Sequence, residues 1–399
     1  MAMSASPVYL AELGLINALG ADRDAVARRL MAGDGSGLTR EAGWLPAGAI
    51  SLVGKVRAEL PPIPQRLARY DCRNNRLLLA ALAQIADGVE DILSRHGRSR
   101  IGVVLGTSTS GIAEGEVAIA ALQRDGRMPD AFHYARQEIG SSAPFLADHL
   151  GLLGPAYTIS TACTSSAKAL VSARMMLAAG LCDAVLAGGA DSLCRLTVSG
   201  FSALESVSAE PSNPMSVNRC GINIGEGAAL FLVTRDEAAI ALQGCGESSD
   251  AHHMSAPHPD GRGAEQAMRA ALADAGIRPE DIAYVNLHGT ATAKNDEMES
   301  RAMHRVFPPG TPASSTKPLT GHLLGTAGAT EAAFCWLALR DREGRLPPHI
   351  WDNCPDPELP ALNLVRVGDR MSRNGRRSVM SNGYAFGGSN VSLVLGDAP

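Results

Sequence analysis

One cysteine and two histidines of this chain stand in segments whose composition suits nucleophilic catalysis. Cys163 lies in the run Ile-Ser-Thr-Ala-Cys-Thr-Ser-Ser over residues 159–166. His288 opens the run His-Gly-Thr-Ala-Thr, and His322 ends the run Lys-Pro-Leu-Thr-Gly-His, so both imidazoles have small neighbours. A thiol accompanied by imidazoles is typical of covalent thioester chemistry. We therefore take Cys163 as the candidate nucleophile.

The residues around Cys163 predict a strand followed directly by a helix. Residues 156–162 read as a strand of Tyr, Thr and Ile, and residues 164–179 have the apolar spacing of a helix that ends at Gly180. Cys163 would then stand at the helix N-terminus, where unpaired N–H groups lower a thiol pKa and bind an oxyanion. The alternative is a buried structural cysteine, since the chain has eight cysteines. The turn of small residues favours the catalytic interpretation.

Each of the two histidines follows a predicted strand. Residues 283–287 read as a buried strand that leads to His288, and residues 313–316 form a short strand before His322. A lone histidine is more often a hydrogen-bonded core or surface residue. A histidine that follows a strand, with Lys317 and a glutamate on the same turn-helix unit, is a better candidate for an oriented imidazole.

The composition is that of a globular protein with a large core. The 399 residues are 45% hydrophobic but only 4% aromatic, which suits a core of Ala, Val, Leu and Ile. No basic region followed by a long apolar run opens the chain, and no stretch approaches 18 uncharged apolar residues. The cysteines form no C-x-x-C pair, so reduced thiols are expected. These features predict a soluble cytoplasmic protein.

Short apolar strands alternate with helical patterns along the chain. Residues 101–105, 184–187 and 391–395 are apolar runs of the kind found in sheets covered on both faces. Residues 264–275 have helical spacing and end at Gly276. The alternation predicts an α/β layered fold.

Several further motifs occur in a specific order. They are the Gly-Glu-Gly-Ala run at residues 225–228, the histidine-containing segment 249–261, the two histidine runs with Lys317, Gly328 and Glu331, and the glycine-rich run 382–390. With the cysteine run, these motifs extend along nearly the whole chain. Together they resemble the β-ketoacyl-acyl-carrier-protein synthases, the elongating condensing enzymes of fatty acid and polyketide synthesis.

The resemblance implies a thiolase-like α/β fold. Two pseudo-symmetric halves, residues 1–243 with the nucleophile and residues 244–399 with both histidines, would form a five-layer αβαβα arrangement. Such folds usually join edge strands of two subunits, so the resemblance also implies a homodimer or a heterodimer with a related subunit.

The resemblance further implies a mechanism with an acyl carrier protein as partner and no metal or redox cofactor. Cys163 would take the acyl group from a phosphopantetheine thioester, and a malonyl-carrier would then lose carbon dioxide to give the attacking enolate. The resemblance also implies roles for the remaining site residues. His288 and His322 would donate to the enolate oxygen, and Lys317 and Glu331 would tune and orient His322. Thr290 and Thr292 would bind the pantetheine arm, and the backbone N–H groups of Cys163 and Phe386 would hold the oxyanion.

Two surface patterns have competing interpretations. One face of a predicted helix carries four arginines, Arg66, Arg69, Arg73 and Arg76. Such a face is usually only solvated. The resemblance implies instead that it docks the acidic carrier, with Arg124 and Arg127 extending the patch. A second cluster comprises His252, His253 and His258, which could suggest a metal site. These histidines lie in a Pro-containing loop without a supporting carboxylate pattern, so we interpret the loop as lining the active site.

Departures from the family pattern predict a specialised pathway, such as polyene or polyketide assembly. Ala385 replaces a glycine of the usual Phe-Gly-Phe-Gly-Gly gate, Cys220 replaces the aspartate of Arg-Asp-Gly, and Glu210 stands where a docking arginine is expected. A thiolase would need a second cysteine beyond Cys354, and a Cys-His-Asn starter enzyme would lack His322. A thiolase-fold acyltransferase, a non-reacting partner subunit and the catalytic half of a heterodimer remain alternatives.

Overall fold

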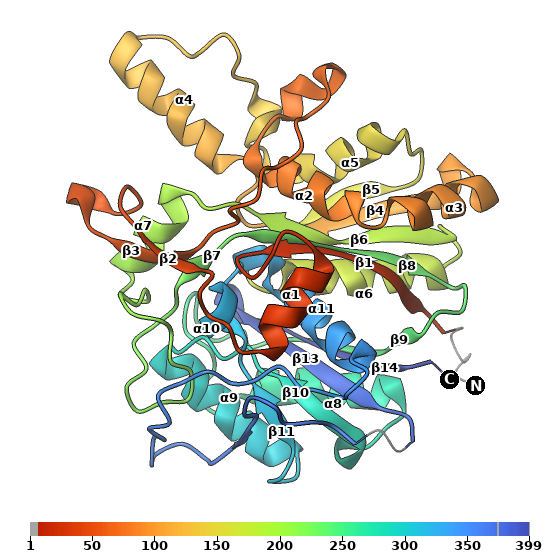
Figure 1. The fold of residues 1–399 in the computed structure, drawn as a ribbon, viewed down its shortest axis with the longest axis vertical. Helices are drawn as coiled ribbons and strands as arrows, with labels where there is room; N and C mark the ends of the chain where they lie inside the picture. Colours follow the sequence, from red (N-terminus) through yellow and green to blue (C-terminus); the bar gives the residue numbers. More distant parts are fainter. Residues whose placement is uncertain (1–6, 373–374, 399) are drawn as a thin grey trace.

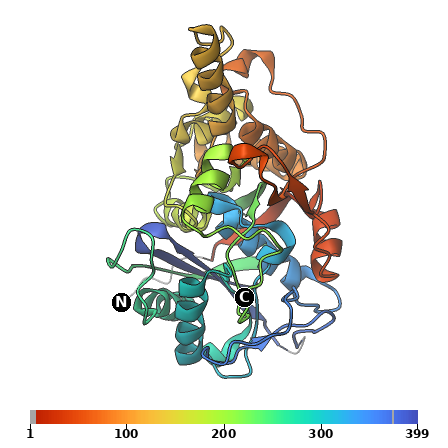
Figure 2. The same cartoon turned by 90° about the vertical axis from the view of Figure 1, so that its left-hand side faces the viewer.

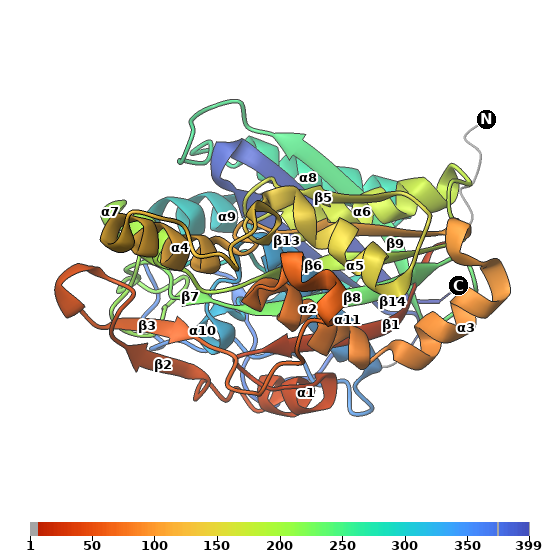
Figure 3. The same cartoon turned by 90° about the horizontal axis from the view of Figure 1, so that it is seen from above.

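The chain forms five alternating layers of helices and strands (Figure 1). The structure is a computed structural model that describes residues 7–372 and 375–398. Helices α2 and α5 pack on one face of β1, β4, β5 and β8; α6 and α11 pack together in the middle; α8 covers the outer face of β9 and β14 and contacts α9. A view turned about the vertical axis keeps the same stacking (Figure 2), and the view from above looks down through the layers (Figure 3). The arrangement confirms the predicted α/β five-layer fold.

The described residues contain these strands and α-helices. The strands are β1 (Tyr9–Asn17), β2 (Leu38–Glu41), β3 (Ser51–Gly54), β4 (Ile101–Gly106), β5 (Ala156–Ile159), β6 (Ala184–Asp191), β7 (Ile224–Gly225), β8 (Gly227–Thr234), β9 (Ile240–Ser249), β10 (Ile282–Asn286), β11 (Pro312–Ser314), β12 (Asn363–Leu364), β13 (Ser378–Ala385) and β14 (Ser389–Asp397). The helices are α1 (Arg23–Met31), α2 (Arg73–Ala83), α3 (Ala86–His96), α4 (Ile112–Asp125), α5 (Ser142–Leu150), α6 (Ser165–Ala178), α7 (Arg195–Ala203), α8 (Arg262–Ala275), α9 (Ala293–Val306), α10 (Lys317–Thr320) and α11 (Ala327–Arg340).

The large sheet repeats one topology on either side of the contact between β1 and β9. Its order is β12-β11-β10-β13-β14-β9-β1-β8-β6-β4-β5. Outward from β1, the next two strands pair antiparallel and the following two pair parallel. The series from β9 through β14, β13, β10 and β11 has the same pattern. The predicted boundary between residues 243 and 244 falls inside β9, a few residues beyond the point where this repeat begins.

The topological repeat places the reactive segments at equivalent positions. Cys163 follows β5, and His322 follows β11 and the short helix α10. Loops at the carboxyl ends of parallel strands meet at one edge of a sheet and commonly form ligand sites. Helix α6 of the first half packs closely against α11 of the second half. The contact is so close that a Cβ on Gly328 would lie 2.6 Å from the Ala167 Cβ.

Small side chains make the middle layer thin enough for this contact. Residues 327–339 of α11 are all buried, and five of them are alanine. The predicted strands and helices around both motifs occur with ends shifted by a few residues. None of the helices in the described residues is long and apolar enough to cross a membrane.

Candidate active site

A strained turn holds the nucleophile between β5 and α6. Ala162 has a φ of 52°, in the left-handed region that alanine rarely adopts. The Ser165 hydroxyl fastens the turn: it accepts the Thr161 N–H at 2.9 Å and donates to the Ala162 carbonyl at 2.6 Å. Cys163 therefore stands just before the first turn of α6, as predicted.

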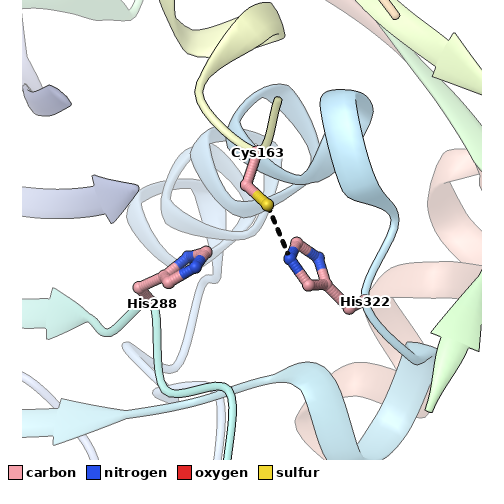
Figure 4. Close-up of side chains that lie close together, drawn as sticks. All are labelled: Cys163, His288 and His322. Atoms are coloured by element: carbon pink, nitrogen blue, oxygen red, sulfur yellow. Dashed lines mark hydrogen bonds between the residues drawn. The ribbon is translucent and has the colours of Figure 1, made fainter. Parts of the chain in front are cut away.

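The two histidines meet the cysteine at one point (Figure 4). The His322 Nε2 atom lies 3.0 Å from the Cys163 Sγ atom. The sulfur and a ring nitrogen from each histidine lie within 4.8 Å of one another. The imidazole rings are nearly perpendicular, with centroids 5.4 Å apart. The structure thus brings together the three residues that the sequence singled out.

A backbone contact fixes the tautomer of His322. The Leu324 N–H donates to Nδ1 of His322 at 3.2 Å. The Nδ1 atom is therefore an acceptor, and in a neutral imidazole the proton must lie on Nε2. His322 consequently directs an N–H donor at the Cys163 sulfur. This arrangement stabilises negative charge on the sulfur or on a nearby oxygen, and it leaves His322 without a free nitrogen to act as a base.

Lys317 contacts His288 and Glu331, whereas the resemblance implied that Lys317 and Glu331 tune and orient His322. The Lys317 ammonium donates to the His288 carbonyl and pairs with a Glu331 carboxylate oxygen. It also lies 3.4 Å from Nδ1 of His288, so the proton of that neutral ring is on Nε2. Lys317 acts on His322 only through its charge, at longer range.

Burial keeps the reactive groups neutral in the resting site. It raises the pKa of the Cys163 thiol to about 12, with Lys317 opposing the shift. Burial and the charge of Lys317 together lower the pKa of both His288 and His322 well below the ordinary histidine value. The prediction of a lowered thiol pKa was therefore wrong, because loss of water outweighs the charge of Lys317 in this pocket.

The same three side chains are the strongest candidate for a metal site. A thiolate and two imidazoles are typical zinc ligands. Metal binding at Nε2 of His322 would force its proton onto Nδ1, where it would clash with the Leu324 N–H. The ammonium beside Nδ1 of His288 opposes a cation there as well. The contacts therefore favour hydrogen-bond donors over metal ligands.

A cavity of about 530 Å³ leads to these residues. Its wall includes Thr290 and Thr292, whose hydroxyl groups are 2.8 Å apart, and Phe386. The loop that follows β9 also lines it, through Asp250 and residues 255–257. This confirms the prediction that the histidine-containing loop borders the active site.

Phe386 lies beside the cavity on a short glycine turn. Its ring is 40% exposed, and its centroid lies 5.6 Å from that of Phe201 at the end of α7. The Gly387 N–H donates to the Met254 carbonyl at 2.8 Å, which joins the turn to the loop after β9. Ala385 has a φ of −128°, so the departure from glycine is compatible with this conformation.

Three buried carboxylates position the catalytic loops, and the sequence reasoning missed them. Glu299 accepts the backbone N–H groups of His288 and Gly289, each at 2.7 Å. Asp296 accepts the Ala291 N–H from the same loop. Asp191 accepts backbone N–H groups both from residues 108–109 and from residue 326. Acidic residues in the first turns of α9, directly after the histidine loop, were the available signal.

The predicted arginine face is not one helix face. Asp71 and Cys72 have extended backbone conformations that interrupt the helix. The interruption separates Arg66 and Arg69, on the 3-10 helix Gln65–Tyr70, from Arg73 and Arg76 on α2.

These arginines also have internal partners. Arg73 donates to Glu226, which is fully buried, at 2.8 Å, and its own side chain is 32% exposed, so an internal ion pair already engages the guanidinium that was predicted to dock the carrier. Arg66 donates to two carbonyls at the end of α5, and Arg69 pairs with Asp148 at 3.0 Å. Arg66 and Arg69 remain exposed.

Comparison with known proteins gives matches along the chain. The family models described as beta-ketoacyl synthase, N-terminal domain, and beta-ketoacyl synthase, C-terminal domain, match residues 46–239 and 239–350. The chain is 34% identical to 3-oxoacyl-[acyl-carrier-protein] synthase 2 of Vibrio cholerae over 355 residues, which are 83% of this chain and 85% of that protein. It is 31% identical to the chloroplastic 3-oxoacyl-[acyl-carrier-protein] synthase II of Arabidopsis thaliana, over 97% of this chain and 75% of that protein.

Solved structures share the fold. A chain of the Xenorhabdus doucetiae structure of a ketosynthase in complex with its chain length factor superposes with a TM-score of 0.93 at 47% identity, covering 98% of both chains. A beta-ketoacyl synthase from Burkholderia phymatum gives a TM-score of 0.85 at 28% identity, covering 99% of this chain and 100% of that one. With the motifs and the Cys-His-His geometry, these matches show that the chain belongs to the beta-ketoacyl synthase family.

Proposed function

We propose that this protein condenses a malonyl-carrier with an acyl group held on Cys163, in polyketide- or polyene-type assembly. The observation that carries the proposal is the 3.0 Å contact between the Cys163 sulfur and the Nε2–H donor of His322, with His288 beside them at the end of a cavity. A reacting acyl group here would meet a nucleophile and two neutral N–H donors.

The proposed reaction has two stages. The Cys163 sulfur attacks the thioester carbonyl of an acyl-carrier as its thiol proton leaves; the backbone N–H groups of Cys163 and Phe386 hold the oxyanion, and the carrier sulfur departs and takes up that proton. A malonyl-carrier then loses carbon dioxide, and the N–H groups of His288 and His322 stabilise the enolate oxygen. The enolate carbon attacks the acyl-enzyme, the Cys163 thiolate leaves, and the product is a β-ketoacyl-carrier with two more carbons. Thr290 and Thr292 would hydrogen-bond the pantetheine arm.

The edge strand β5 supports a partner subunit of related fold. Apolar side chains on and near it are exposed: Leu153 by 77%, Tyr157 by 38% and Met175 by 65%. Exposed edge strands with apolar neighbours are places where another chain adds to a sheet. We propose a dimer there, either of two copies or with a chain length factor, the partner of the X. doucetiae ketosynthase. Arg66 and Arg69 remain proposed contacts for the acidic carrier.

All eight cysteines of the sequence are free thiols, which suits action in the reducing cytoplasm. The test of the function uses purified protein, alone and with a candidate chain length factor, mixed with acyl-carriers and a malonyl-carrier. Intact mass spectrometry should show acyl mass on the wild type but not on Cys163→Ala, followed by a product two carbons longer. Acylation without extension, with or without the partner, would contradict a condensing enzyme and favour an acyltransferase.

A further inference from the structure

The cationic side chains that line the catalytic cavity differ in their partners. Two of the described residues line it, Arg219 and Lys294, and Arg219 pairs with Asp356. Lys294 also lines the cavity, yet it is exposed and has no acidic partner within residues 7–372 and 375–398. Among the described residues, Lys294 is therefore the lining cation that forms no ion pair.

The position of Lys294 within α9 is locally unfavourable. It occupies the first turn of the helix, where the unpaired N–H groups and the helix dipole disfavour a cation. The preceding Thr292 side chain makes no capping hydrogen bond to this turn. A residue that conflicts with its local electrostatics without a compensating contact points to a ligand, and here the ligand must be anionic.

The chain from His288 to Lys294 leads from the inner end of the cavity to its mouth. His288 is 3% exposed and Thr290 is 6% exposed, Thr292 is half-buried, and Lys294 is exposed. All four residues line the cavity. An extended group that reaches Cys163 past the two threonines therefore passes Lys294 on the way in.

Arg219 adds a second cation to the same rim. The Gly221 N–H donates to the Ala291 carbonyl at 2.8 Å, which fixes the segment that carries Arg219 against the histidine loop. The Nε–H of Arg219 is buried and has no hydrogen-bond partner among the described residues. Figures 1 and 3 both place α9 on the same side of the molecule as α7, whose residue Phe201 also lines the cavity.

We propose that Lys294, assisted by Arg219, binds the phosphodiester of the carrier's phosphopantetheine arm. This inference rests on the proposed function, since it requires that a pantetheine thioester enters the cavity. The phosphate lies at the end of the arm remote from the thioester, so it reaches the mouth when the thioester reaches Cys163. A phosphate oxygen there would neutralise Lys294 and accept from the N-terminus of α9.

The test compares three acyl donors that share one acyl group: acyl-pantetheine, acyl-phosphopantetheine and the acyl-carrier. The second-order rate of Cys163 acylation is measured by intact mass for wild type, Lys294→Gln and Arg301→Gln. Arg301 lies on the same helix, pairs with Glu297 and does not line the cavity, so it is the matched control. For Lys294→Gln, the preference for acyl-phosphopantetheine over acyl-pantetheine should fall by about fivefold to tenfold.

Salt provides an independent arm. Raising the ionic strength from about 0.01 M to about 1 M shortens the Debye length from about 30 Å to about 3 Å, so the wild-type preference should shrink toward that of Lys294→Gln. An unchanged preference in the variant overturns the inference. A loss confined to the acyl-carrier would assign Lys294 to the carrier surface, and an equal loss with acyl-pantetheine would make it part of the cavity wall; both results also overturn it. If no donor acylates the wild type, the proposed function itself fails.

Discussion

The buried ion pair between Lys317 and Glu331 gives the sharpest test of how the site is built. The two side chains are 3% and 4% exposed. Lys317→Met removes the ammonium and leaves a carboxyl group in the interior, which typically destabilises a protein by about 3–5 kcal/mol. The His288 carbonyl also loses its donor, which adds about 1–3 kcal/mol. We expect the variant to lose about 4–8 kcal/mol of unfolding free energy at neutral pH.

A second variant separates the carboxyl group from the carbonyl. Lys317→Met with Glu331→Leu removes both charges, so only the unpaired His288 carbonyl should remain as a cost, about 1–3 kcal/mol. The double variant should therefore be more stable than the single one by about 3–5 kcal/mol. It should still be slow in malonyl decarboxylation, because His288 has lost the group that holds its ring, while acylation of Cys163 is largely retained.

The pH dependence follows from the carboxyl group. Burial raises the pKa of Glu331 to about 7 even with Lys317 present, and removing Lys317 raises this pKa further. A carboxyl group whose folded pKa is raised destabilises the fold above its unfolded pKa, and the loss grows with pH until the folded pKa is passed. The stability deficit of Lys317→Met should therefore shrink when the pH falls from about 8 to about 6.

Urea unfolding at the two pH values, with decarboxylation and acylation assayed on the same preparations, measures all three effects. A double variant no more stable than the single one would refute the assignment of the cost to the buried carboxyl group. A deficit independent of pH would refute it as well. Full decarboxylation by the double variant would refute the contact between Lys317 and His288 as the one that matters for catalysis.

Three further predictions follow from the site. His322→Gln, which keeps an N–H donor, should decarboxylate malonyl-carrier faster than His322→Ala, which should lose about 10²–10³-fold; equal rates in the two variants would contradict the donor role. Asp191→Asn should lower the urea midpoint by the equivalent of about 2–4 kcal/mol, because several charge-assisted hydrogen bonds weaken; an unchanged midpoint would count against its bracing role. Ala385→Gly should change the Cys163 acylation rate less than about threefold. Gly388→Ala should reduce this rate strongly, because Gly388 has a φ of 76° and an added Cβ would lie 2.9 Å from the Asp250 Cβ. Similar acylation rates in the two variants would contradict this difference in strain.

Short motifs made the reacting residues predictable. A cysteine or histidine directly after a strand and before a helix has few places to go in a layered fold, so Cys163, His288 and His322 could be expected to meet. The roles of their neighbours depended on distances through space. Lys317 lies five residues before His322 in the chain, yet the helical turn of α10 carries its side chain to His288. Sequence proximity therefore pointed to the wrong imidazole.

The electrostatics of the site could not be predicted from local sequence. The helix start beside Cys163 is a local feature, but its effect on the thiol depends on how much water reaches the sulfur. Cys163 is only 8% exposed, and the His322 ring lies against its sulfur. The arginine spacing failed for a related reason. Extended residues 71–72 break the helix, and Glu226, which lies 153 positions from Arg73, engages its guanidinium in an internal ion pair.

Neutral histidines suit the proposed decarboxylation better than charged ones. A malonyl group enters with its negative charge on the carboxylate and reacts by moving that charge to the thioester oxygen. An imidazolium would attract the carboxylate before reaction and so stabilise the ground state, whereas a fixed N–H donor acts mainly where charge develops. Burial and the Lys317 charge lower the pKa of both histidines. The Leu324 N–H donates to Nδ1 of His322, and the Lys317 ammonium lies beside Nδ1 of His288, so the ring proton of each neutral histidine is on Nε2. In the proposed mechanism, Lys317 therefore holds one ring in place and keeps both rings neutral.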